Sequence, residues 1–168
     1  MKIQTVKGIL ESNTFIVEDG EAVVLIDAGA STVELVKTLG KRIPNVILLT
    51  HEHFDHVHYL KDYQIKFNCP VFSPDDETEI VIKDLKIKPI LCPGHSPKSV
   101  CYLIKDCLFT GDVLFDEGIG RTDLPGSCPE TMQKTLQKLL TVKFAAAYHG
   151  HDDPSTYEQQ QKNIRKYL

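Results

Sequence analysis

The sequence predicts an α/β protein whose sheets contain both parallel and antiparallel strands. Short apolar runs rich in β-branched residues recur along the chain, as at 22–26 and 46–49, and are typical of buried strands. A helical pattern with a short crossover lies between these two runs, which indicates a β-α-β unit covered by a helix. The same order of strands, helix and polar loop then occurs a second time.

The first half of the chain is expected to begin with a β-meander that leads into a helix. An Asp-Gly pair at 19–20 lies between two apolar segments and is a hairpin signal. Ser31 or Thr32 can cap the following helix, and Gly40 ends it. The elements predicted in this half are strands at 13–17, 22–26, 46–49 and 69–72 and helices at 31–39 and 57–64.

The second half is expected to contain mostly hairpins, followed by two helices that flank a last strand. Pro129 and Glu130 open an amphipathic helix with Met132, Leu136 and Leu139 on one side. The helix after the last strand is polar throughout. The elements predicted in this half are strands at 80–82, 85–91, 100–104, 107–110 and 144–148 and helices from 129 and over 155–167.

Length and composition restrict the class of protein. The 168 residues suffice for a sizeable core, so we predict a single domain over residues 1–168 without a separate C-terminal substrate domain. The net charge of −4 argues against nucleic acid or an anionic membrane as a partner. The start, Met1-Lys2-Ile3-Gln4-Thr5, lacks the apolar core of a signal peptide, which predicts a cytoplasmic protein. The five cysteines form no CxxC pair and are predicted to be reduced thiols.

Metal-binding side chains gather directly after the run 46–49, in Thr50-His51-Glu52-His53-Phe54-Asp55-His56. From an extended backbone, His51 and His53 reach one point, while Asp55 and His56 turn toward a second. Later loops at strand ends add further ligand-type residues, namely His95, Asp112 and one or both of His149 and His151. A catalytic zinc needs about three protein ligands, so this set is too large for one ion and suits two. His58, which follows the cluster, is interpreted as a packed or surface residue.

The four loops together resemble the metallo-β-lactamase fold superfamily. The resemblance rests on the HxHxDH cluster, Pro93-Gly94-His95, Gly111-Asp112 and Gly150-His151, and it covers nearly the whole chain. The segments Gly111–Phe115 and Gly120–Gly126 are similar to those of the glyoxalase II-like branch, the hydroxyacylglutathione hydrolases. This resemblance implies a four-layer αββα sandwich with the site at the sheet edge.

The resemblance also implies a role for each ligand. His51, His53 and His95 would hold the first metal ion, and Asp55, His56 and His151 the second. Asp112 would bridge both, and Asp55 and Asp112 are the residues expected to act in catalysis. The cofactors implied are two divalent ions, with zinc favoured over iron or manganese.

Three further residues are candidates for supporting roles. Asp27 matches a family aspartate that braces the cluster by a hydrogen bond to a ligand. His149 stands at a position where the family has proline, and it is a candidate for contact with a ligand or with substrate. Arg121 can contact an anionic substrate or form a salt bridge with Asp123 that fixes the glycine-rich loop.

The function implied is hydrolysis of a small-molecule thioester such as S-lactoylglutathione, by attack of a metal-bridging hydroxide. The alternatives are a mono-iron oxidoreductase similar to persulfide dioxygenases, a hydrolase of another ester or lactone, and a non-enzymatic binding module. Two departures from the family leave open which thiol carries the acyl group of the substrate. The segment between His56 and His95 is short, and only one helix follows His151, where glyoxalase II has a larger helical region that holds glutathione.

Overall fold

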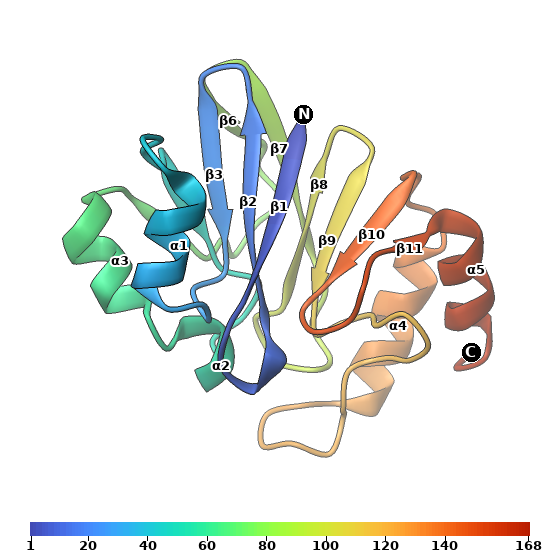
Figure 1. The fold of residues 1–168 in the computed structure, drawn as a ribbon. Coiled ribbons are helices and arrows are strands. Elements are labelled where there is room, and N and C mark those ends of the chain that lie inside the picture. Colours follow the sequence, from blue (N-terminus) through green and yellow to red (C-terminus); the bar gives the residue numbers. More distant parts are fainter. The chain divides into compact units, whose positions relative to one another are not determined.

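The computed structural model describes residues 1–168. The chain forms two compact units, Met1–Ser73 with Val81–Lys86 and Pro74–Ile80 with Ile87–Leu168. Each unit is built on a sheet of mixed strand direction with helices packed on it (Figure 1). The predicted α/β class is therefore confirmed.

The sheet of the first unit has the strand order β1-β2-β3-β4-β5. The first three strands form the expected antiparallel meander, and β3, β4 and β5 run parallel to one another. Because β4 ends at the ligand cluster, the parallel part of the sheet holds the cluster at its carboxyl edge. The strands are β1 (Lys2–Lys7), β2 (Asn13–Asp19), β3 (Ala22–Ile26), β4 (Val46–Leu48) and β5 (Val71–Phe72).

Helices α1 (Thr32–Leu39) and α3 (Leu60–Phe67) lie on one face of this sheet (Figure 1). Ser31 caps α1 by accepting a hydrogen bond from the Glu34 backbone amide, as its position predicts. Apolar side chains of both helices pack on this face of the sheet. The buried cluster consists of Val6, Ile16, Val23, Leu25, Ala28, Ala30, Leu35, Leu39, Ile47, Leu49 and Tyr63.

The helix predicted at 57–64 is confirmed over residues 60–64, but the structure breaks the segment before them and extends the helix to Phe67. In this segment the structure has a one-turn helix, α2 (Phe54–Val57), followed by α3. A short 3-10 helix, η1 (Ile9–Glu11), lies between β1 and β2. The break arises because the Tyr59 amide donates to the carbonyl of Ala28, at 2.9 Å, and so leaves the helical pattern. The second half of the ligand cluster therefore lies on a helix and not in a loop.

The six-stranded sheet has the order β11-β10-β9-β8-β7-β6. The β9–β10 pair is parallel, whereas β7–β8, β8–β9 and β10–β11 are antiparallel. The loops that carry the later ligand-type residues follow β7, β9 and β10. The strands are β6 (Ile80–Ile82), β7 (Leu85–Leu91), β8 (Val100–Ile104), β9 (Cys107–Gly111), β10 (Ala146–His149) and β11 (Ser155–Thr156).

The last long strand begins and ends later than the predicted 144–148. The amides of Ala145 and Ala146 both donate to the carbonyl of Asp106, at 2.7 and 3.4 Å, so the ladder starts only after this turn. A register shift after Tyr148 then pairs His149 with Gly111. His149 is consequently a strand residue with a buried side chain.

Helices α4 (Pro129–Leu139) and α5 (Tyr157–Arg165) pack on this second sheet (Figure 1). Proline at the first position of α4 and a capping box of Thr156 and Gln159 on α5 define their starts. The buried cluster beneath them includes Ile90, Cys92, Cys101, Leu108, Met132, Leu136, Leu139, Ala147 and Ile164. All five cysteines are free thiols, as predicted. None of the helices combines the length and apolar character required to cross a bilayer.

Candidate metal centre

The ligand cluster of the first unit begins where β4 ends. His51 is buried, and its ring centroid lies 4.6 Å from that of His53 and 4.3 Å from that of His56. Asp55 lies in the first turn of α2, and its Oδ2 is 3.5 Å from Nε2 of His56. The strand and the one-turn helix thus bring four ligand-type side chains together within this unit.

Asp27 connects two of these histidines through a chain of hydrogen bonds. Its Oδ2 accepts from Nδ1 of His56 at 2.8 Å and from the Thr50 hydroxyl at 2.7 Å, and Oδ1 accepts from the Thr50 amide at 2.8 Å. The same hydroxyl lies 3.1 Å from Nδ1 of His51. One carboxylate therefore sets the orientation of His56 directly and that of His51 through Thr50.

In the second unit, Asp112 lies between two histidines. Its Oδ2 is 3.7 Å from Nε2 of His95 and 3.5 Å from Nε2 of His151. His95 follows the end of β7 in the Pro93-Gly94-His95 loop, Asp112 directly follows β9, and His151 follows β10. Parallel pairing of β9 and β10 places the last two side chains at one edge of the sheet.

The geometry of these side chains fits divalent metal ions. Nδ1 of His51, His56 and His95 faces an oxygen atom in each case; for His95 it is the carbonyl of Arg121, at 3.0 Å. A hydrogen on Nδ1 leaves the lone pair on Nε2, which is how zinc-binding histidines are held in proteins. The separations of 3.5 to 3.7 Å between Nε2 atoms and carboxylate oxygens also suit atoms that share an ion at about 2.0–2.2 Å.

Comparison with known proteins agrees with this chemistry. The family model of the metallo-beta-lactamase superfamily matches residues 8–83 and 61–151. The chain belongs to the metallo-β-lactamase superfamily. It is 28% identical to the probable metallo-hydrolase YqgX of Bacillus subtilis, with 92% of each chain covered. It is 32% identical to the hydroxyacylglutathione hydrolase of Yersinia pestis, with 84% of this chain and 68% of the relative covered.

Solved structures show the same metallo-β-lactamase fold. BLEG-1 B3 metallo-beta-lactamase matches with a TM-score of 0.91 and 24% identity over 99% of this chain and 100% of that one. TTHA1623 in a di-iron-bound form matches with a TM-score of 0.83 and 27% identity over 97% and 98% of the two chains. The predicted fold class is thus confirmed, and the reaction class of the chain is that of a metallo-hydrolase of this superfamily.

Arg121 forms a bidentate ion pair with Asp123 in this metallo-β-lactamase chain. Its Nε and Nη2 donate to the two carboxylate oxygens at 2.9 Å each, and both side chains are about two-thirds exposed, at 67% and 68%. This pairing with Asp123 raises the pKa of Arg121. The backbone carbonyl, and not the guanidinium, makes the contact with His95.

Replacing Arg121 with alanine is therefore expected to leave metal binding unchanged. The variant keeps the carbonyl that orients His95, and an exposed ion pair contributes little to stability. Chelator competition for zinc and a thermal melt should both match the unaltered protein. A weaker affinity for zinc would show that the side chain holds the loop, and a higher KM alone would show a contact with an anionic substrate.

His149 is fully buried, and neighbouring groups hold both of its ring nitrogens. Nδ1 donates to the carbonyl of Leu114 at 2.8 Å, and Nε2 accepts from the Ser155 hydroxyl at 2.9 Å. Burial lowers the pKa of His149, so the neutral ring is favoured. These hydrogen bonds place His149 between Leu114 and Ser155, and its contact with a metal ligand or with substrate stays a prediction. The sequence did not single out Ser155 as a partner of His149, because a serine carries no periodic signal.

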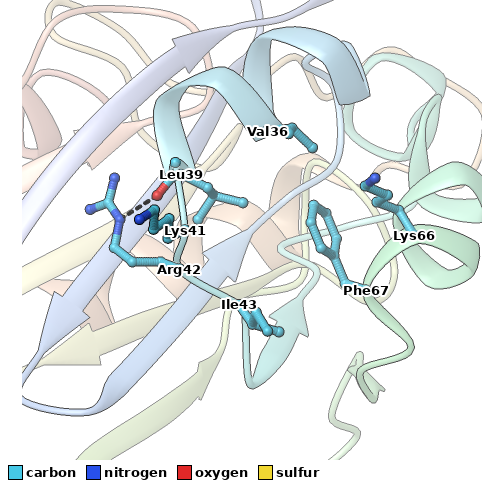
Figure 2. A pocket seen from close by; sticks show the side chains of 8 residues that line it. Val36, Leu39, Lys41, Arg42, Ile43, Lys66 and Phe67 are labelled. Atoms are coloured by element: carbon cyan, nitrogen blue, oxygen red, sulfur yellow. Dashed lines mark hydrogen bonds between the residues drawn. The ribbon is translucent and has the colours of Figure 1, made fainter.

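A surface pocket of about 330 Å³ lies between the ends of α1 and α3 (Figure 2). Val36, Leu39 and Phe67 point into it, and Lys41 and Lys66 lie on opposite sides (Figure 2). Arg42 donates to the carbonyl of Leu39 at 2.6 Å and so shapes its wall. No histidine or carboxylate lines this pocket, which therefore has no part in metal binding.

Proposed function

We propose that this chain is a binuclear metallo-hydrolase that cleaves thioesters. The observation that carries the proposal is the common orientation of His51, His56 and His95, whose Nδ1 atoms all face oxygen atoms. In the proposed centre, His51, His53 and His95 would hold the first ion. Asp55, His56 and His151 would hold the second ion, and Asp112 would contact both.

Asp112 and Asp27 have different proposed roles in this centre. Oδ2 of Asp112 lies within 4 Å of Nε2 of both His95 and His151, which are proposed ligands of different ions, as a bridging carboxylate requires. By accepting from Nδ1 of His56, Asp27 would leave the lone pair of Nε2 available to hold the second ion. When bound, the two ions supply an activated water molecule and polarise the carbonyl group of the substrate.

The thioester substrate is proposed from the relatives. The hydroxyacylglutathione hydrolase of Yersinia pestis is 32% identical over 84% of this chain. Hydrolysis of a thioester needs no nucleophilic side chain of the protein when metal ions activate water. The two fully buried cysteines, Cys92 and Cys101, lie in the core of the second unit and are not proposed as nucleophiles. Burial raises the pKa of the Cys101 thiol and so keeps it protonated and unreactive.

A combined measurement of metal content and turnover tests this function. The purified protein should contain two zinc ions per chain and hydrolyse S-lactoylglutathione or a simple acyl thioester without consuming oxygen. Dialysis against a chelator should abolish turnover, and added zinc should restore it. One iron per chain with persulfide-dependent oxygen uptake would instead establish the oxidoreductase alternative and contradict the proposal.

A further inference from the structure

The terminal helix α5 carries two buried polar side chains. Gln160 is 0% exposed and Asn163 is 2% exposed, although the helix as a whole is polar. Burying a side-chain amide without hydrogen bonds is unfavourable, so a buried amide is expected to have hydrogen-bond partners. The backbone carbonyl partners of both amides lie in one segment of the chain, residues 115–118.

Both side chains bind carbonyl groups of the loop that follows Asp112. Nε2 of Gln160 donates to the carbonyl of Phe115 at 2.8 Å. Nδ2 of Asn163 donates to the carbonyl of Gly118 at 2.8 Å, and Oε1 of Gln160 accepts from Nδ2 of Asn163 at 3.2 Å. The two amides therefore form one connected unit that clamps residues 115–118.

This loop determines where two proposed ligands stand. The Phe115 amide donates to the carbonyl of Gly118 at 3.0 Å, and the Gly120 amide donates to that of Val113 at 3.1 Å, so the loop closes on itself. Asp112 stands at its beginning, and at its end the carbonyl of Arg121 accepts from Nδ1 of His95.

The loop is closely packed at Gly120. A Cβ atom at Gly120 would lie 1.9 Å from the Asp112 carbonyl oxygen and 3.0 Å from the ring of His95. A shift of the loop would therefore move the backbone of Asp112 and the acceptor of His95 together.

The same network reaches the loop of His151. Nε2 of Gln160 also donates to the Ser155 hydroxyl at 2.9 Å, and that hydroxyl donates to His149. His149 in turn holds the carbonyl of Leu114. The buried polar groups of α5 thus connect the segments that carry all three ligand-type residues of this unit.

We propose that Gln160 and Asn163 are positioning residues of the metal centre, which act by fixing the loop 112–121 and through it Asp112 and His95. This inference rests on the proposed function, because it assigns the two amides a role toward the metal ions. The competing role is purely structural: the amides would then support the fold without influencing the ligands.

The variants Gln160→Met and Asn163→Leu remove the amides at similar side-chain volume. Gln161→Met is the matched control, because Gln161 lies on the same helix but donates to the carbonyl of Leu140, at 3.2 Å, which directly follows α4. Competition with a fluorescent chelator should show zinc affinity lower by about 10- to 100-fold in the two variants and unchanged in the control. Thermal melts of all three identify variants that fail to fold, and Gln160→Asn, which keeps an amide on a shorter side chain, then serves as the milder replacement.

A second readout does not require bound metal. In the metal-free protein at pH 8, ¹⁵N spectra of the histidine rings should show His95 with its hydrogen on Nδ1, because the Arg121 carbonyl accepts it. In Gln160→Met the two neutral tautomers should become mixed, whereas Gln161→Met should match the unaltered protein. Unchanged zinc affinity or an unchanged His95 tautomer in a folded variant would overturn the inference. If the unaltered protein binds no zinc, the proposed function fails, and the tautomer measurement still decides whether α5 positions His95.

Discussion

Replacing His53 with alanine should remove nearly all activity and release metal from the protein. His53 is half-buried next to His51, with ring centroids 4.6 Å apart, and it is proposed as one of three protein ligands of the first ion. Loss of a direct ligand should weaken binding by more than the roughly 10- to 100-fold that follows from loss of an outer partner. Metal analysis after gel filtration and thioester turnover measure the two effects.

His58 provides the control for this variant. It lies five residues further along, and its exposed ring contacts Phe54 and Tyr59 at centroid distances of 4.6 Å each. His58→Ala should therefore retain metal and turnover. Near-normal turnover in His53→Ala, or an equal loss in both variants, would disprove the assignment of His53 as a ligand.

The strands and the ligand cluster could be predicted because their signals are local. β3 and β4 are uninterrupted apolar runs, and the alternation of His51 and His53 directly after β4 depends only on the geometry of an extended chain. The start of α1 follows from the side chain of Ser31 in the same way. Each of these predictions needs only a few neighbouring residues.

The features that could not be predicted depend on contacts between distant residues. The break before α3 arises from the carbonyl of Ala28, which lies 31 positions before Tyr59 in the chain. Gln160 and Asn163 look like ordinary polar residues of a surface helix, and only the folded loop 115–118 gives them partners. Periodicity identifies an apolar face, but it contains no information about a buried amide.

Asp27→Asn should weaken the binding of both ions with a single isosteric change. Asp27 has a positive φ of 63°, which asparagine also adopts readily, so the backbone should remain as it is. In the unaltered protein the carboxylate of Asp27 accepts hydrogen bonds from the Thr50 amide, the Thr50 hydroxyl and Nδ1 of His56. The substitution removes the negative charge and places an NH₂ group near these three donors. Asparagine keeps one acceptor oxygen for three donors, and its NH₂ group displaces at least one of them, which should release the orientation of His56 and, through Thr50, that of His51.

The expected result is a fall in affinity of about 10- to 100-fold for each ion, because an outer partner of a ligand is lost in both cases. Titration of the metal-free protein with zinc, followed by calorimetry, resolves the two ions. Asp75→Asn, at an exposed acidic turn, is the control and should bind zinc as the unaltered protein does. Gln160→Met should act through His95 and Asp112, whereas Asp27→Asn should act through His51 and His56. Because His51 and His95 are proposed ligands of the same ion, the losses of affinity in the double variant should depart from a simple sum.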